Sequence, residues 1–327
     1  MKKFLAMACI VMLTACNNND EDDNSNNGIV GNYRDDMREF VIGISQKAKS
    51  VRSGFAVIPQ NGIELVSSNG DEDGMPVTTY LNAVDGNGQE DLFFGYVSDD
   101  EPTPAEDNAY LRGLLNISKN AGKTILVTDY VSTPYKITSS YQQNQSAGYV
   151  SFAATERALN TIPAGQPHNV NTSNITSLSQ AKNFLYLINP ENFASKQAFI
   201  SAVAATNYDA LIMDLFFEGQ QFTPDEIQQL KQKANGGTRM VICYMSIGEA
   251  ENYRYYWESS WTTSPPSWLA AENPDWPGNY KVRYWNADWQ GIIYKNNDSY
   301  LDRIITTGFD GVYLDIIDAF EFFEGAS

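Results

Sequence analysis

Short apolar runs alternate with amphipathic segments along most of the chain. Each run is bounded by polar or turn-forming residues and has the length of a buried strand. Eight runs are predicted to be strands, at residues 55–59, 81–85, 124–127, 148–153, 184–188, 210–213, 240–245 and 311–314. Residues 161–180 are polar and contain three prolines or glycines, which is typical of a linker.

Helical spacing of apolar residues separates several of these runs. Helices are predicted at 35–51, 108–119, 195–205 and 290–306. Thr223-Pro224-Asp225-Glu226 is a capping box with proline at the first helical position, so it predicts a helix that runs on to Gly236-Gly237. Strands that alternate with helices indicate a parallel sheet, and eight such units favour a closed (β/α)8 TIM barrel of the α/β class.

The first 31 residues have the features of an export signal. Lys2-Lys3 precede an apolar run over residues 4–13, and Leu13-Thr14-Ala15-Cys16 resembles a bacterial lipobox. We therefore expect a signal peptide over residues 1–15 and lipidation of Cys16, although an ordinary signal with a chance cysteine is the alternative. Residues 16–31 are polar and acidic, and they are expected to form a disordered tether. The protein is then exported and anchored to a membrane by lipid, on the periplasmic or cell-surface side of an outer membrane.

Charge and composition exclude several classes of function. The net charge is −18, with 22 basic and 40 acidic residues, which argues against nucleic acid as a partner. The single histidine, His168, makes a Ser-His-Asp triad or a His-ligated metal centre unexpected. No cofactor and no metal are expected, and the protein is expected to be a monomer. Once the signal and Cys16 are set aside only Cys243 remains, so no intramolecular disulfide is expected.

Carboxylates follow most of the predicted strands. The residues at six strand ends are Gln60, Glu90, Asp129, Asp214, Glu249 and Asp315. Because the carboxyl ends of barrel strands share one face, these side chains would form a ring of acids, with Arg254 and Arg283 as candidate partners. Such a ring can hydrolyse glycosides, bind a hard cation or bind cationic sugars. The simpler interpretation of Asp315 is that it caps a turn.

All six tryptophans lie between residues 257 and 289, interleaved with tyrosines. A loop of this length needs a small core of its own, which accounts for most of these rings. Flat rings above an acidic site also suit the faces of sugars.

Three stretches resemble a known family, namely Tyr244–Arg254, Trp276–Val282 and Gly308–Asp318. They resemble exported α/β-barrel proteins related to glycoside hydrolase family 114, the endo-α-1,4-polygalactosaminidases. Residues 59–62, 89–93 and 127–130 match as well, and the resemblance extends over residues 32–324. It implies a glycoside hydrolase that cleaves an extracellular or envelope polysaccharide, possibly one that contains galactosamine. The alternative is a carbohydrate-binding barrel lipoprotein without turnover.

The resemblance also implies roles for individual residues. Asp315 corresponds to the nucleophile and Glu90 to the acid and base of a retaining mechanism. That scheme requires carboxyl groups about 5–5.5 Å apart, a raised pKa for Glu90 and an ordinary or lowered one for Asp315. The expected substrate-binding residues are Gln60, Asn61, Asp129, Tyr130, Asp214, Tyr244, Glu249, Glu251, Arg254, Trp285 and Asp318.

The order of the matching blocks differs from the family. The block that comes first in the family is here residues 182–327, and residues 32–160 match its C-terminal half. This order implies a circularly permuted single barrel over residues 32–327, joined through residues 161–181. A closed barrel tolerates new termini at a surface loop, and the start of the first helix should then lie near the C-terminal tail.

Overall fold

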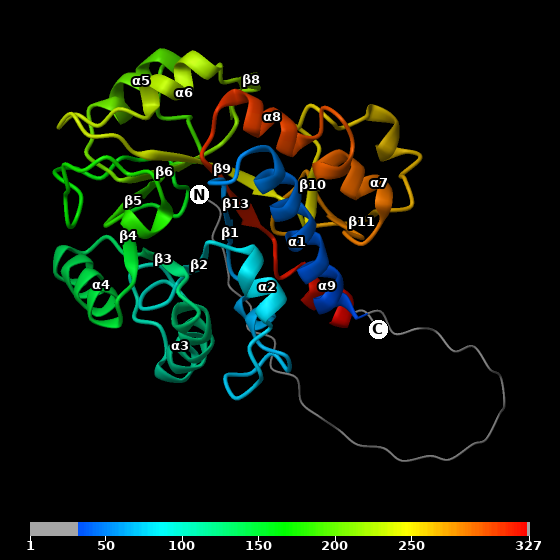
Figure 1. Ribbon diagram of the computed structural model, residues 1–327, viewed down its shortest axis with the longest axis horizontal. Helices are drawn as coiled ribbons and strands as arrows, with labels where there is room; N and C mark the ends of the chain where they lie inside the picture. Colours follow the sequence, from blue (N-terminus) through cyan, green and yellow to red (C-terminus); the bar gives the residue numbers. More distant parts are fainter. Residues whose placement is uncertain (1–31, 326–327) are drawn as a thin grey trace.

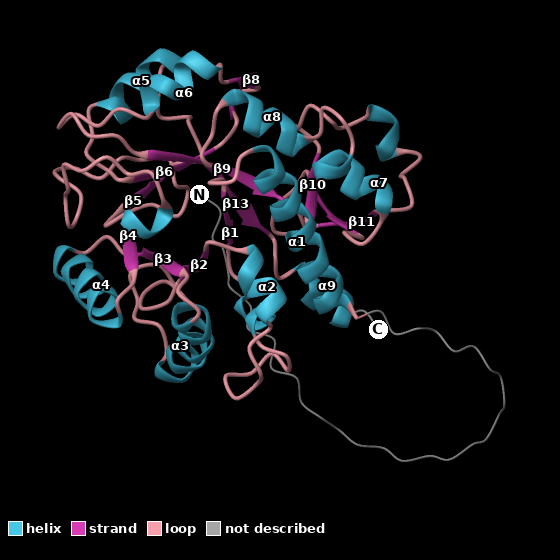
Figure 2. Ribbon diagram, in the orientation of Figure 1, coloured by secondary structure: helices cyan, strands magenta, loops and turns pink. Residues whose placement is uncertain are grey.

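Eight parallel strands form the centre of the molecule within residues 32–325, the part that the computed structural model describes (Figures 1 and 2). Five of them form a sheet in the order β1-β13-β9-β6-β5, and three form a second sheet in the order β2-β3-β4. The first sheet comprises β1 (Ala56–Pro59), β5 (Phe184–Tyr186), β6 (Ala210–Met213), β9 (Met240–Ser246) and β13 (Gly311–Asp315). The second comprises β2 (Gly86–Glu90), β3 (Thr124–Tyr130) and β4 (Val150–Ala154).

The two sheets approach each other along both of their edges. At one edge the carbonyl of Val57 accepts the N–H of Asp85, and the carbonyl of Gly88 accepts the N–H of Asn61, both at 2.9 Å. At the other edge the rings of Phe152 in β4 and Phe184 in β5 lie 5.8 Å apart. The mixed α/β structure with a parallel centre, which the sequence predicts, is therefore confirmed, and its arrangement is barrel-like.

Helices surround the strands (Figure 2). They are α1 (Tyr33–Val51), α2 (Thr78–Ala83), α3 (Ala105–Asn120), α4 (Pro134–Ala147), α5 (Lys196–Ala204), α6 (Pro224–Leu230), α7 (Ala287–Gln290), α8 (Tyr300–Thr307) and α9 (Ala319–Gly325). The predicted capping box is confirmed, because Thr223 Oγ1 accepts the N–H of Glu226 and Glu226 Oε2 accepts the N–H of Thr223. Short helical turns are η1 (Ile63–Val66), η2 (Leu178–Gln180), η3 (Ser259–Thr262) and the π-helical η4 (Gly291–Lys295).

The aromatic segment after β9 contains an antiparallel sheet that the sequence does not predict. It pairs β10 (Glu249–Glu251), β12 (Asn279–Val282) and β11 (Leu269–Glu272) in that order. In the same aromatic segment four tryptophan rings contact one another in a chain, with ring centres 5.2 Å, 4.9 Å and 5.0 Å apart: Trp257, Trp261, Trp268 and Trp289. Most of these rings therefore serve the segment's own core. A smaller hairpin is formed by β7 (Phe216–Phe217) and β8 (Gln220–Gln221).

Three sequence predictions of secondary structure are wrong, and one helix is missed. Residues 81–85 are not a strand, since α2 ends at Ala83 and the strand that follows is Gly86–Glu90. The helix after the capping box ends at Leu230, before Gly236-Gly237. The predicted helix 290–306 is interrupted, because α8 begins anew at Tyr300, after the N-cap Ser299, whose hydroxyl accepts the N–H of Asp302. The sequence also misses α4, whose exposed face and polar composition hide its periodicity.

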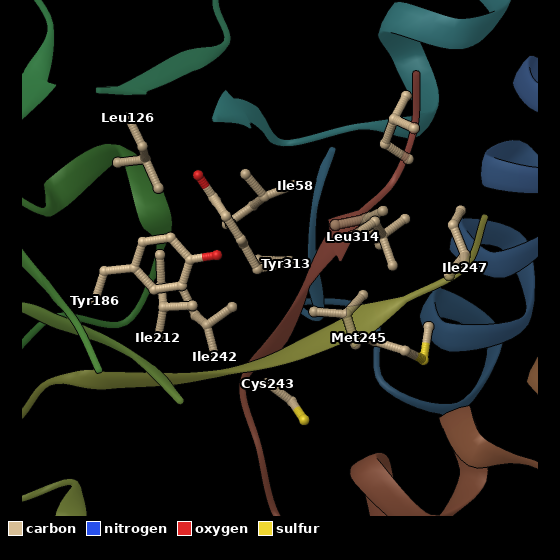
Figure 3. Close-up of a cluster of buried hydrophobic side chains, with 14 of the residues drawn as sticks. Ile58, Leu126, Tyr186, Ile212, Ile242, Cys243, Met245, Ile247, Tyr313 and Leu314 are labelled. Atoms are coloured by element: carbon tan, nitrogen blue, oxygen red, sulfur yellow. The ribbon is translucent and has the colours of Figure 1, made fainter. Parts of the chain in front are cut away.

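Large side chains fill the space between the strands (Figure 3). Ile58 of β1 and Tyr244 of β9 are in register with Tyr313 of β13, so the three side chains share one face of the sheet. In Figure 3 Tyr313 points into the interior together with Leu126 of β3, whereas Cys243 points away from it. The interior is thus a packed core, and chemistry has room only at its ends.

The start of α1 lies beside α9 (Figure 1). Arg34 Nε lies 2.9 Å from Glu324 Oε1, and the rings of Tyr33 and Phe323 are 5.6 Å apart. The predicted closeness of the first helix to the C-terminal tail is confirmed. The predicted signal peptide, Cys16 and the tether over residues 16–31 lie outside the described residues. Within residues 32–325 no helix combines the length and apolarity needed to cross a membrane.

Gly88 offers a test of how tightly this interior is packed. A Cβ atom on Gly88 would overlap the hydroxyl and ring of Tyr313, both of which are held in the core. We expect Gly88→Ala to lower the free energy of unfolding by about 1–3 kcal/mol, measured by urea denaturation. Gly54→Ala is the control, since nothing lies within 4 Å of its added Cβ. Equal stability of the two variants would contradict this account of the packing.

Candidate active site

Glu90 and Asp315 end two strands of the central ring, β2 and β13. Side chains alternate along a strand, so Asp315 points to the same side as Tyr313, and Glu90 to the same side as the interior Gly88 position. The negative charge of Glu90 acts on Asp315, and both charges act on the buried hydroxyl of Tyr313. The two carboxylates predicted as the catalytic pair therefore lie at the same end of the interior.

Asp315 has an environment that favours its protonated form. Burial, and next the negative charge of Glu90, raise the pKa of Asp315 to about 7. Tyr244 opposes this rise by donating its hydroxyl to Asp315 Oδ2 at 2.6 Å. The expectation of an ordinary or lowered pKa for Asp315 is thus wrong. The sequence could not show how strongly this strand end is desolvated, which is the largest cause of the rise.

Glu90 is held by neighbours from two adjacent strands. Tyr130, at the end of β3, donates its hydroxyl to Glu90 Oε1. Asn61 donates its amide to Oε2 at 3.1 Å and accepts the backbone N–H of Glu90 at 3.0 Å. Asn61 has a positive φ of 57°, in the left-handed region that asparagine adopts more readily than most residues. Next to it, Gln60 accepts the hydroxyl of Tyr186 at 2.8 Å.

Arg157 is a neighbour of this site that the sequence does not predict. Its guanidinium carbon lies 3.8 Å from the ring centre of Tyr130, and its Nη2 lies 2.9 Å from Asp91 Oδ1. Burial raises the pKa of Asp91 to about 7, and the ion pair with Arg157 opposes that rise. Arg157 follows β4 in an irregular loop, where no spacing signal could have linked it to Glu90.

A second polar group joins the ends of β6 and β10. Arg254 Nη2 lies 2.7 Å from Asp214 Oδ2, and Arg254 Nε donates to Glu251 Oε2. The predicted pairing of Arg254 with the acids is confirmed, whereas Arg283 donates instead to the carbonyls of Ser267 and Leu269. The negative charge of Glu251 acts on the hydroxyl of Tyr244, which donates to Asp315, so this group borders the Asp315 site.

Glu249 and Asp318 both lie near Lys281. Glu249 is fully buried; its Oε1 accepts the Asn273 amide at 2.8 Å and lies 2.7 Å from Lys281 Nζ. Its Oε2 is buried and has no hydrogen-bond partner among residues 32–325. Burial raises the pKa of Asp318 to about 6, although the charge of Lys281 opposes it. In the described part of the chain, no three His, Cys, Asp or Glu side chains converge to hold a metal ion.

Two predicted substrate-binding residues have structural surroundings instead. Asp129 is fully buried, and its carboxylate accepts four hydrogen bonds, from the N–H groups of Phe93 and Phe94 and from the side chains of Ser140 and Asn144. It therefore ties the loop after β2 to α4 and has no free lone pair for a ligand. Trp285 packs 5.1 Å from Tyr33 and 4.8 Å from Phe323, where α1 meets α9.

The raised pKa of Asp315 predicts a pH-dependent stability. Because the folded protein holds this proton to about pH 7 and an unfolded chain loses it near pH 4, the contribution is fully present below about pH 4 and is lost as the pH rises through about 7. Asp315→Asn should gain stability over the native protein by on the order of a few kcal/mol between about pH 4 and pH 8, in urea denaturation. Asp275→Asn, at an exposed site, is the control. Parallel curves for Asp315→Asn and the native protein would contradict the prediction.

Part of the chain matches a known protein family. Residues 166–327 match the glycoside-hydrolase family GH114. The chain is 37% identical to an uncharacterized protein of Methanocaldococcus jannaschii over 181 residues, which cover 53% of this chain and 49% of that protein. It is 39% identical to an uncharacterized protein of Thermotoga maritima over 120 residues, covering 37% and 36%, and 41% identical to one of Deinococcus radiodurans over 125 residues, covering 38% of each. The chain thus spans half or less of the length of these relatives. Through residues 166–327 the chain is related to glycoside-hydrolase family GH114.

Proposed function

We propose that the chain is a lipid-anchored glycoside hydrolase that cleaves an extracellular or envelope polysaccharide with Glu90 and Asp315. The observation that carries the proposal is the pairing of two carboxylates at the ends of β2 and β13, each held by its own hydrogen bonds. Within residues 32–325 neither acid forms an ion pair with a lysine or arginine, so neither is tied up in a salt bridge. Two carboxyl groups at one site are the basic requirement of glycoside hydrolysis.

In the proposed reaction Asp315 attacks the anomeric carbon while Glu90 gives its proton to the leaving oxygen. The bond from the anomeric carbon to that oxygen breaks, and a bond to Asp315 Oδ forms. Glu90 then takes a proton from water, whose oxygen displaces Asp315 and releases the sugar with retained configuration. Tyr244 and Tyr130 stay protonated, because burial raises the pKa of both hydroxyls well above their usual value. They can therefore donate to the carboxylates throughout the cycle.

The pKa of Asp315 adds a requirement to this scheme. In the free site the proton favours Asp315, whereas attack requires its carboxylate form. Binding of the substrate must then favour the ionised form of Asp315 before the bond breaks.

The proposed substrate is a polysaccharide that contains galactosamine. The support is the resemblance to the galactosaminidases together with the acidic surroundings, where Asp318 and Glu251 accompany the catalytic pair. A cationic amino sugar is favoured by such a field. The other predicted contacts, Gln60, Asn61, Tyr130, Asp214, Tyr244, Glu249 and Arg254, remain proposals.

We also propose that the eight strands close into a single (β/α)8 barrel that is circularly permuted relative to the family. The hydrogen bonds between β1 and β2 and the contact of Phe152 with Phe184 support closure. The contact of Arg34 with Glu324 supports permutation. In a permuted barrel the chain no longer connects the two segments that carry these residues, but the segments remain neighbours. The match to the family over residues 166–327 is consistent with a boundary near residues 161–181.

Hydrolysis can be tested with the soluble form that lacks residues 1–28, on a panel of polysaccharides that includes a galactosamine polymer, chitosan and a neutral galactan. We expect Asp315→Asn and Glu90→Gln each to lower the rate of reducing-end release by about 10²–10⁴-fold. Glu39→Gln, on the exposed side of α1, is the control and should leave the rate unchanged. Absence of cleavage, with sugar binding that survives both changes, would favour the carbohydrate-binding barrel without turnover.

The lipid anchor can be tested separately. We expect Cys16→Ser to abolish incorporation of an alkyne-labelled fatty acid and to move the protein from the membrane fraction to the soluble one. Cys243→Ser is the control, since Cys243 is buried in the core and should not carry lipid. Continued labelling of Cys16→Ser would refute the anchor.

A further inference from the structure

Tyr253 is an exposed aromatic residue that is fixed from two directions. The exposed fraction of Tyr253 is 63%. Its hydroxyl nevertheless donates to Glu251 Oε1 at 2.6 Å, and the guanidinium carbon of Arg254 lies 5.2 Å from its ring centre. Glu251 and Arg254 are themselves buried and joined to each other, so both anchors are rigid. One face of the ring therefore rests on a cation and the rest is available to a ligand.

This degree of order is unusual for an exposed side chain. An exposed tyrosine normally samples several rotamers, and a ligand that stacks on it must first restrict them. A ring whose tip and one face are already held avoids most of that entropic cost. Tyr253 thus has the properties of a pre-ordered platform for a flat ligand surface.

The position of Tyr253 connects it to the candidate active site. Tyr253 follows β10 by two residues, and its anchor Arg254 is paired with Asp214 at the end of β6. The other anchor, Glu251, acts through its charge on Tyr244, which donates to Asp315. The platform therefore stands on the same polar group that borders the catalytic pair.

We propose that Tyr253 is the stacking platform of a sugar-binding subsite next to Asp315. Its ligand is one pyranose ring of the polysaccharide, which lays its C–H face on the open face of the phenol ring. The proposal rests on the proposed function, because the site next to it is taken to bind a polysaccharide. Tyr253 does not touch the reacting atoms, so its contribution is to affinity and to the placement of the chain.

The test measures binding without cleavage. The full chain carrying Asp315→Asn, in mild detergent, is run through native gels that contain each polymer of the panel, and its retardation gives a dissociation constant. We expect Tyr253→Ala to weaken retardation by the best polymer about tenfold, because the stacking surface is lost. Tyr253→Trp, which keeps a flat ring, should retain the retardation. Tyr135→Ala, at a tyrosine on α4 that is 71% exposed, is the control and should have no effect.

The outcomes separate the subsite from the hydrolase. Retardation that is equal in Tyr253→Ala and the parent, or absent for every polymer, overturns the platform. If the native chain cleaves a polymer and Tyr253→Ala has the same KM for it, the platform is overturned as well, while the proposed hydrolase activity is supported. Retardation that depends on Tyr253 in a protein that cleaves nothing supports the platform while the hydrolase fails. If Tyr253→Ala unfolds, Tyr253→Leu, which has bulk but no flat face, is compared with Tyr253→Trp. Weaker retardation of Tyr253→Leu supports the platform, and equal retardation overturns it.

Discussion

The contact between Tyr313 and Gly88 determines how the two sheets meet across the interior. The Tyr313 ring occupies the space in which any larger residue at position 88 would place its side chain. Two residues further along each strand lie Asp315 and Glu90. Because strands are stiff over two residues, the approach of Tyr313 to the backbone of β2 also sets the separation of the two carboxylates. Packing in the core and geometry at the site are therefore one constraint.

That constraint places two acids in surroundings that water reaches poorly, and the structure accommodates them unequally. Glu90 receives hydrogen bonds at both of its oxygens, from Tyr130 and Asn61. Asp315 receives a side-chain hydrogen bond at one oxygen, from Tyr244, and its pKa is raised to about 7. Burial and the negative charge of Glu90 favour the protonated form of Asp315 in the free site, so the surroundings of Asp315 must change when substrate binds before it can act as the proposed nucleophile.

The sequence predicts those features of the fold that rest on apolar pattern, and it fails where the pattern is absent. β13 and β6 are short continuous apolar runs and are predicted correctly. β2 is missed because Gly86 and Gly88 carry no side chain, although closeness to Thr124 and Tyr313 is the reason they must be glycine. At the site, Asp129 and Glu90 both sit at strand ends and look equivalent in the sequence. Only the tertiary structure reveals that α4 supplies Ser140 and Asn144 to saturate Asp129.

The contact of α1 with α9 has a mechanical consequence under the proposed anchoring of the N-terminal end. Tension on the segment before residue 32 enters the fold at Tyr33 and Arg34, which are joined to Phe323 and Glu324. From α9 only residues 316–318 lead back to Asp315. The load is thus shared between the outer helix and the strand that carries the candidate nucleophile. Under the proposed anchoring, a pull on the N-terminal segment would load the site more directly than the far side of the ring, where β4 and β5 lie.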